Sequence, residues 1–383
     1  MEKSVSKAKK KSFWQSGRLD ITFLSFVLIL LTIGLVMLFS ASYAYSYENY
    51  GSSYKFIVRQ AFFAALGIGM LFLTSKINYH FWQRMSWIIY FITLGFLGAL
   101  LALPPMVSGM NVRRWFAIGS LTFQPSEIAK FAIVVLFARL IAANPKLMVR
   151  WKFVGSLFLI LGITCFLVVM EPHISATLLI GMIGVALIFI GGLDRRIAIA
   201  GVILVVSAAV MVIATQSTGF IGYGGDRIKY WLDPWLDPTG EGFQTIQSLL
   251  AIGSGGILGR GLGQSRQKYL WVPEPHNDFI FSIVCEELGL IGAVVIILLF
   301  ALLVWRGFTI AMRAADKFGS LLAIGLTLQV GLQAMFNIWV VTNTMPNTGI
   351  SLPFFSYGGT SLLILLAEMG IVLSVSRGSN IEK

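Results

Sequence analysis

Long runs without a charged residue recur along the whole chain. Lys317 and Glu368 enclose fifty residues that contain no Asp, Glu, Lys or Arg. Other uncharged runs cover residues 21–47, 85–112, 153–170, 197–225 and 288–305. A helix of roughly 20 apolar residues crosses a bilayer core of about 30 Å, and these runs have about that length or more. A helix of a water-soluble protein would instead carry a charged face. The pattern therefore predicts an all-α, polytopic integral membrane protein.

The runs predict about ten transmembrane helices in a single membrane domain at residues 20–377. We expect the helices at residues 20–42, 55–75, 84–104, 124–142, 153–170, 174–191, 196–214, 279–305, 318–342 and 357–376. Lys and Arg gather in the short loops on one side, which the positive-inside rule assigns to the cytoplasm. A basic tail at 1–19 and a short tail at 378–383 are then cytoplasmic. One long loop, at 216–277, lies on the outer face between the seventh and eighth helices.

The composition agrees with a membrane protein and excludes several other classes. Hydrophobic residues make up 57% and charged residues 12%, with a mean hydropathy of +0.82. The net charge of +12 does not indicate a nucleic-acid partner, because the basic residues lie in short loops between apolar segments. Membrane lipids are the expected surroundings. Cys165 and Cys285 lie in or beside apolar segments, and the three histidines are about a hundred residues apart, so neither a disulfide nor a metal cluster is predicted.

Basic residues also occur in two outer segments, where the positive-inside rule leaves few of them. Arg114 precedes the fourth helix, and Arg227 belongs to the long outer loop. Positive charge on this side is explained if it binds an anionic group such as the diphosphate of a lipid headgroup. We therefore regard Arg114 and Arg227 as candidate substrate-binding residues.

The most informative polar cluster covers residues 272–278, directly before the eighth helix. Ionisable side chains at a membrane boundary are costly and are functional candidates by default. Asp278 precedes the apolar residues of the helix, so it either caps the helix N-terminus or acts as a base, and the two roles are compatible. For Glu286 and Glu287, two turns further on, a helix-pairing role is favoured over a catalytic one.

Three further segments have alternative interpretations. Glu127 and Lys130 share one helical face, and both an intrahelical ion pair and the wall of a polar cavity remain open. In the uncharged loop at 346–360, a structural re-entrant turn is favoured over lining the same site as Asp278. The glycine-rich run at 253–263 does not match a nucleotide-binding motif, and it predicts a close-packed turn or a short surface helix.

Four blocks of residues, in order, resemble the SEDS family of bacterial shape, elongation, division and sporulation proteins, the FtsW and RodA type. They comprise residues 113–115 with 123–127, 227–235, 247–256, and 273–289 followed by 348–359. The resemblance covers about residues 20–377. The paired arginines before Trp115 are slightly closer to the FtsW branch.

The resemblance implies a peptidoglycan glycosyltransferase in the bacterial cytoplasmic membrane. Such an enzyme polymerises lipid II into glycan strands at the outer face, for cell division or cell shape, beside a class B penicillin-binding transpeptidase. The family's essential carboxylate falls on Asp278, which we expect to be the general base.

Further site residues follow from that chemistry. The leaving diphosphate needs cationic compensation, from Arg114, Arg227, Lys130 or a divalent cation such as Mg²⁺ or Mn²⁺. No dedicated metal ligands are visible. Glu127 and His276 complete the candidate substrate-binding residues.

The chain departs from the family's pattern at two positions. Asn277 replaces the usual Thr before Asp278, which exchanges one polar residue for another. His173 stands in Glu171-Pro172-His173, where the family usually has Asp after the proline. This change puts in doubt any role carried over to that position and makes His173 a candidate pH-sensitive site.

Two functions of other classes compete with polymerisation. A flippase for lipid II would need charged groups along a path at mid-membrane depth. A scaffold that only recruits a transpeptidase would have no chemical use for an ionised Asp278.

Overall fold

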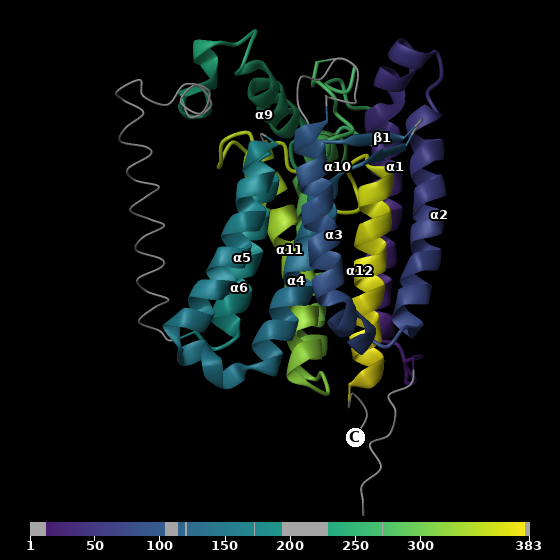
Figure 1. Cartoon of the computed structure of the whole chain (residues 1–383). Helices are drawn as coiled ribbons and strands as arrows, with labels where there is room; N and C mark the ends of the chain where they lie inside the picture. Colours follow the sequence, from purple (N-terminus) through teal and green to yellow (C-terminus); the bar gives the residue numbers. More distant parts are fainter. Residues whose placement is uncertain are drawn as a thin grey trace, which may run out of the picture.

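The computed structural model describes residues 13–103, 114–118, 121–171, 173–193, 229–269 and 271–379. Its long helices stand side by side as one bundle (Figure 1). Within the described residues, seven helices are long and apolar enough to cross a membrane: α1 (Ile21–Tyr50), α2 (Lys55–Lys76), α3 (His80–Ala102), α5 (Trp151–Met170), α10 (Ile280–Met312), α11 (Lys317–Val341) and α12 (Gly359–Gly378). The shorter α6 (Ile174–Ile190) and the charge-bearing α4 (Pro125–Ala143) belong to the same bundle. Every predicted span except the seventh coincides with one of these helices, and the seventh, at 196–214, lies outside the described residues.

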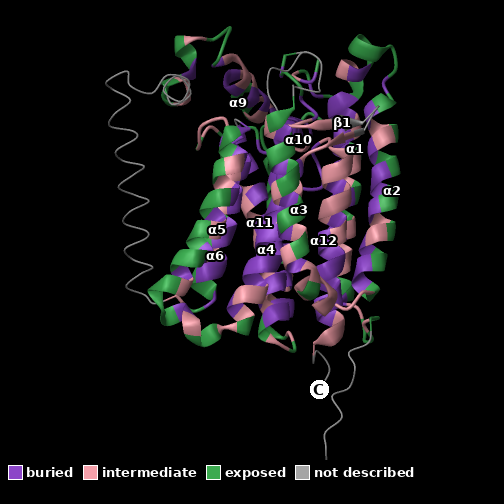
Figure 2. Ribbon diagram, in the orientation of Figure 1, coloured by how far each residue is buried: buried purple, intermediate pink, exposed green. Residues whose placement is uncertain are grey.

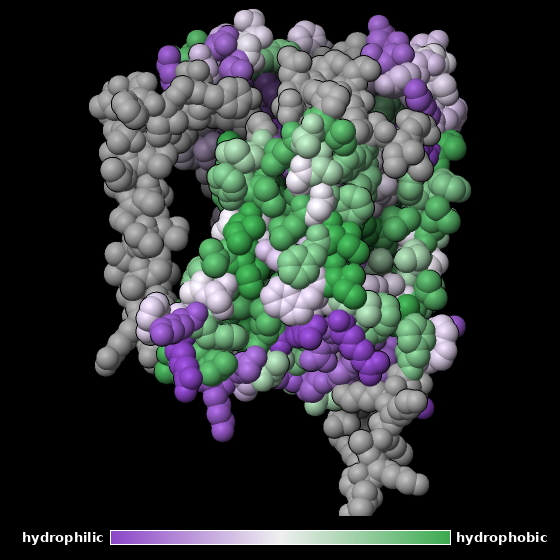
Figure 3. All heavy atoms as spheres, viewed as in Figure 1, coloured by the Kyte–Doolittle hydropathy of each residue, from purple (hydrophilic) through white to green (hydrophobic). Residues whose placement is uncertain are grey.

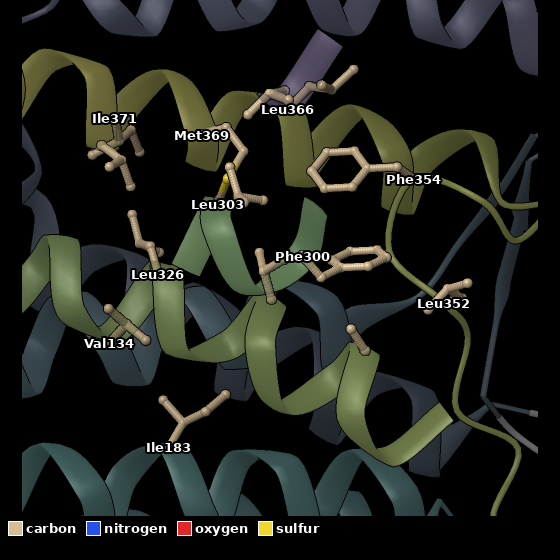
Figure 4. Close-up of a cluster of buried hydrophobic side chains, with 14 of the residues drawn as sticks. Val134, Ile183, Phe300, Leu303, Leu326, Leu352, Phe354, Leu366, Met369 and Ile371 are labelled. Carbon is tan, nitrogen blue, oxygen red and sulfur yellow. The ribbon is translucent and has the colours of Figure 1, made fainter. Parts of the chain in front are cut away.

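The interior of the bundle is built around α4, α11 and α12 (Figure 2). Val134 on α4, Leu326 on α11 and Met369 on α12 are fully buried, and Figure 4 shows them in one apolar cluster with Phe300 and Leu303 of α10. Large apolar side chains also cover the outside. The view in Figure 3 shows a broad hydrophobic band with hydrophilic residues along its lower edge. An apolar surface on an apolar core is expected when the surrounding solvent is lipid.

The helix ends are set by local polar contacts. Asp20 caps α1 by accepting a hydrogen bond from the N–H of Phe23 at 2.9 Å, and it also binds Arg306 at 2.8 Å. At the other end, α1 continues to Tyr50, well beyond its predicted end at residue 42. Gly51 then ends it with a left-handed φ of 67°, and its N–H donates to the carbonyl of Tyr47.

Short elements cover the end of the bundle that the positive-inside pattern assigns to the outer face. A two-stranded antiparallel hairpin, β1 (Phe116–Ile118) and β2 (Leu121–Phe123), leads into α4. The sequence did not predict this hairpin. The described part of the long outer loop holds the 3-10 helix η2 (Pro234–Leu236) and the helix α9 (Phe243–Gly255). A second 3-10 helix, η1 (Pro145–Val149), joins α4 to α5 at the opposite end.

The glycine-rich run packs against a break in α10, as a close-packed turn should. Gly289 interrupts α10 with a φ of 67°, and a Cβ atom there would lie 2.2 Å from the backbone nitrogen of Gly259. Glu286 and Glu287 bind this turn. The Glu287 carboxylate accepts hydrogen bonds from Gly263 N–H at 2.9 Å, Lys268 Nζ at 3.0 Å and Ser40 Oγ of α1 at 2.7 Å. The contact to α1 confirms the favoured helix-pairing role for Glu287, whereas Glu286 binds the glycine-rich turn and the residues that follow it.

Candidate active site

The backbone that carries Asp278 is held by three consecutive carbonyl contacts. The N–H of Tyr357 donates to the carbonyl of His276 at 2.9 Å, and Ser356 Oγ donates to that of Asn277 at 2.7 Å. Asn337 Nδ2, on α11, donates to the carbonyl of Asp278 at 2.6 Å. Asn337 is fully buried and also donates to the carbonyl of Ile350 at 2.6 Å. The segment before α10 is therefore fixed from α11 and from the loop between α11 and α12.

The Asp278 side chain does not cap α10. The N-cap residue of α10 is Phe279, and no side-chain cap bond is made there, so the capping interpretation is wrong. Instead, Asp278 lies against the loop at 346–358. A Cβ atom on Gly349, whose φ is 69°, would lie 3.2 Å from Asp278 Oδ2. Glycine is required at this position, because a side chain would both strain the backbone and crowd the carboxylate.

A cavity of about 510 Å³ opens beside Asp278. It brings together four of the predicted site residues, namely Asp278, Arg114, Glu127 and Lys130. The loop between α11 and α12 also contributes, through Gly349, Ile350, Ser351, Tyr357 and Gly358. Lining the site was the less favoured interpretation of this loop, and the structure supports it alongside the structural role. Arg227 lies outside the described residues.

Glu127 and Lys130 are both an ion pair and a wall of the cavity. Lys130 Nζ lies 2.9 Å from Glu127 Oε1 and donates to Gln333 Oε1 of α11, also at 2.9 Å. Gln333 in turn donates to Ser351 at 3.1 Å. Lys130 is only 2% exposed, so these two partners replace the water that would otherwise surround its ammonium group. Pro125 occupies the first turn of α4, where proline is favoured because its missing N–H needs no partner.

Burial and, to a smaller extent, the charged groups of the cavity set the proton affinity of Asp278. Partial burial raises the pKa of its carboxyl to about 6, the nearby charge of Glu274 raises it further, and Arg114 opposes both. A carboxylate with this pKa is still ionised at neutral pH, and it accepts a proton more readily than an ordinary Asp.

Arg114 also lies beside the connection between α5 and α6. Its Nε donates to the carbonyl of Glu171 at 3.4 Å. The Glu171 side chain is fully buried, and neither carboxylate oxygen has a hydrogen-bond partner among the described residues. Burial raises the pKa of Glu171 to about 8, against the effect of Arg114, so the group is neutral at pH 7. Its neutrality explains how it stays buried without a partner.

His173 lines the cavity but does not act as a pH sensor. Burial, with Arg114 and Lys130 nearby, lowers its pKa to about 3. Its Nδ1 lies 3.2 Å from Gln124 Nε2 and 3.3 Å from Ser126 Oγ. The prediction of a pH-sensitive His173 is wrong, because an imidazole with this pKa stays neutral across the physiological range.

His276 lies beside the cavity rather than in its lining. Its ring is enclosed by Phe56 at 4.3 Å, Tyr45 at 4.8 Å and Tyr357 at 5.9 Å between centroids. Burial lowers its pKa to about 4. The structure therefore gives His276 a packing position next to the Asp278 loop and does not bring it to the substrate side with Asp278.

Several cavity residues escaped the sequence analysis. Arg59, in the first turns of α2, and Glu274 carried a detectable signal, since both are charged residues at the edge of apolar segments. Gln333 and Thr360 did not, because uncharged polar residues are common in membrane helices. Thr360 Oγ1 donates to the carbonyl of Thr122 at 2.8 Å and thereby joins the hairpin to α12. Within the described residues, no group of three or more His, Cys, Asp or Glu side chains is placed to hold a metal ion.

A bundle of apolar helices with a charged cavity at one end defines an integral membrane protein that handles a polar substrate at the membrane surface. Known proteins identify the family. The model of the FtsW, RodA and SpoVE family, described as cell cycle proteins, matches residues 21–381, and the chain belongs to this family.

Relatives match over nearly the full length of both chains. Stage V sporulation protein E of Bacillus subtilis is 39% identical over 371 residues, which cover 94% of this chain and 97% of that protein. The probable peptidoglycan glycosyltransferase FtsW of Geobacter sulfurreducens is 36% identical over 366 residues, covering 94% and 95%.

Solved structures show the same fold. A chain from a peptidoglycan synthase complex that coordinates polymerization and crosslinking superimposes with a TM-score of 0.78 at 29% identity, covering 95% of this chain and 99% of that one. The rod shape determining protein RodA of Thermus thermophilus gives a TM-score of 0.69 at 25% identity, covering 95% and 98%.

Proposed function

We propose that Asp278 is the general base with which this peptidoglycan glycosyltransferase polymerises lipid II into glycan strands. Membership in a family whose relatives are named glycosyltransferases supports the activity. The observation that carries the role of Asp278 is its place in the cavity, half-buried, with a pKa raised to about 6 and with Arg114 and Lys130 in the same lining.

The reaction is a substitution at the anomeric carbon of a sugar. The acceptor hydroxyl oxygen forms a bond to that carbon while the bond from carbon to the diphosphate oxygen breaks, with inversion. Asp278 takes the hydroxyl proton, and the electron pair of the broken bond leaves with the diphosphate. A positioned base contributes about 10²- to 10⁴-fold in rate.

We propose that the cations of the lining compensate the negative charge of the leaving group. Arg114 offers a planar fork of donors that matches two phosphate oxygens, whereas Lys130 offers a single charge already bound to Glu127 and Gln333. We assign the direct contact with the diphosphate to Arg114. Lys130, which is more deeply buried, adds a second positive charge to the cavity. A divalent cation such as Mg²⁺ or Mn²⁺ is a second source of compensation that we propose, because the oxygens of the leaving diphosphate are ligands that such ions prefer. The test of this proposal is whether a chelator of divalent cations lowers the polymerisation rate.

The flippase alternative receives less support. Glu368, halfway along α12, is a buried acidic group at mid-depth, and Gln329 of α11 donates to it at 2.8 Å. The space that continues inward from Glu127 toward Gln329 has a volume of only about 20 Å³. That volume holds about one water molecule, so the described residues offer a disaccharide headgroup no path at this point.

The polymerase is expected in the bacterial cytoplasmic membrane, where we propose that it works with a class B penicillin-binding transpeptidase. The similar chain from a synthase complex that couples polymerization with crosslinking supports such a partner.

The test is gel analysis of glycan products from purified protein and lipid II. The parent should form polymer, and Asp278→Asn should lower the rate by about 100-fold or more while folding normally. Glu274→Gln, the neighbouring carboxylate of the same cavity, is the matched control and should keep most of the activity. Polymer from Asp278→Asn at the parental rate would contradict the general-base role.

A further inference from the structure

The outer end of α1 carries a row of exposed tyrosines. Tyr43, Tyr47 and Tyr50 follow a spacing of four and three residues, which places them on one helical face. They are 43%, 64% and 51% exposed, and Tyr54, just before α2, is 60% exposed. Ser42 and Ser46, next to Tyr43 and Tyr47 in the sequence, are fully buried. We call Tyr43, Tyr47, Tyr50 and Tyr54 the tyrosine ridge.

The ridge extends beyond the hydrocarbon of the membrane. Tyr43 lies about 33 Å and Tyr50 about 44 Å along the axis from Ile21, at a rise of 1.5 Å per residue. The Asp20–Arg306 ion pair marks the opposite, charged end of α1. A hydrocarbon core of about 30 Å therefore ends before the ridge begins. Figure 1 shows the end of α1 standing above the start of α2. Tyrosines that anchor a protein at the lipid interface lie in the headgroup region directly above the hydrocarbon core, which includes Tyr43, whereas Tyr50 lies beyond that region.

Aromatic rings in edge-to-face contact connect the ridge to the catalytic cavity. Tyr357 lines the cavity, and its ring meets that of Phe56 edge-on at 4.8 Å. Phe56 in turn contacts Tyr50 of the ridge at 5.8 Å. Lys55 lies 3.2 Å from the centroid of the Tyr50 ring and adds a cation. An aromatic path thus leads from the cavity wall to the exposed face of α1.

The chemistry of the ridge fits an uncharged sugar chain. Residues 39–54 contain six aromatic residues together with Ser, Asn and Gly, and Glu48 is their one charged residue. Sugar rings present faces of C–H bonds that pack on aromatic rings, and their hydroxyl groups hydrogen-bond to Tyr, Ser and Asn side chains. Tyrosine also provides a large contact area at a low cost in conformational entropy.

We propose that the tyrosine ridge binds the growing glycan strand as it leaves the active site. The inference rests on the proposed strand polymerisation, but it does not depend on the role of Asp278. A bound strand stays attached between additions, so the ridge should increase the number of sugars added before release and leave the chemical step unchanged.

The test compares two double variants of the full-length protein. Tyr43→Ala with Tyr47→Ala removes two rings, whereas Tyr43→Phe with Tyr47→Phe keeps both. Trp151→Ala, at an exposed site on the far end of α5, controls for the loss of a surface aromatic residue. Two readouts are required: the length distribution of strands at equal lipid II consumption, and the affinity for a lipid-free glycan oligosaccharide.

We expect the double alanine variant to bind the oligosaccharide about tenfold more weakly and to make shorter strands, with the initial rate of lipid II consumption unchanged. The double phenylalanine and Trp151→Ala variants should resemble the parent. Unchanged strand length and affinity in the double alanine variant would overturn the proposal, and so would a fall in initial rate with unchanged affinity. If the parent itself makes no polymer, the proposed function fails, whereas the oligosaccharide affinity still tests the ridge.

Discussion

Asn337 should be essential for turnover although it lies outside the lining of the cavity. Its side chain donates hydrogen bonds of 2.6 Å to the carbonyls of Asp278 and Ile350, one from each loop of the site. In Asn337→Ala both buried carbonyls lose their donor, which costs about 1–3 kcal/mol for each. We expect the free energy of unfolding to fall by about 2–4 kcal/mol. This value is below the sum of the largest costs, because the substitution also removes Asn337 Oδ1, a buried oxygen without a partner in the described residues.

The effect on catalysis should exceed that on binding. A shift of about 1 Å in a positioned catalytic group can lower the rate about 100-fold, so kcat should fall by about that factor with little change in KM. The assay is initial lipid II consumption by purified variants together with their thermal stability. Thr164→Val provides the control, because it removes buried hydrogen bonds to Tyr90 and Ile160 at a site remote from the cavity. Parental kcat in Asn337→Ala, or an equal loss of kcat in Thr164→Val, would refute the positioning role.

Three further substitutions test the remaining groups of the site. Glu127→Gln leaves the buried ammonium of Lys130 without its anion and should destabilise the protein by about 3 kcal/mol, measured by thermal unfolding, whereas a change within about 0.5 kcal/mol would show that the pair is not structural. Arg114→Lys should lower polymerisation partly and Arg114→Ala more severely, because Lys keeps the charge and loses the bidentate fork; equal rates in all three proteins would place the diphosphate elsewhere. His276→Phe should retain most activity, because the ring is neutral and packed among aromatic side chains, and a loss as large as that of Asp278→Asn would instead make His276 a substrate ligand.

Charges in apolar surroundings were the reliable guide to the site. Asp278, Arg114, Glu127 and Lys130 were all selected because an ionisable side chain near or inside a membrane needs a partner, and the structure places all four around one cavity. The span pattern was equally reliable, because roughly 20 apolar residues have few alternatives to a membrane-crossing helix.

Contacts between distant segments were beyond the reach of the sequence. Asn337 lies 59 residues from Asp278 along the chain, and nothing in its own helix marks it as a donor to that backbone. The hairpin has strands of three residues, too short for an alternating pattern to show. His276 was chosen for its neighbours in sequence, yet the cage that surrounds it comes from α1, α2 and the loop before α12.

The pH dependence of kcat/KM tests the central role of Asp278 most directly. The base must be ionised to act, so the rate of the parent should fall as the pH decreases through about 6, the raised pKa of Asp278. The negative charge of Glu274 contributes to that rise, so Glu274→Gln should move the acidic limb to lower pH, while Asp278→Asn should lack the limb altogether. An acidic limb at the same pH in the parent and in Glu274→Gln, or a persisting limb in Asp278→Asn, would contradict the assignment of Asp278 as the base.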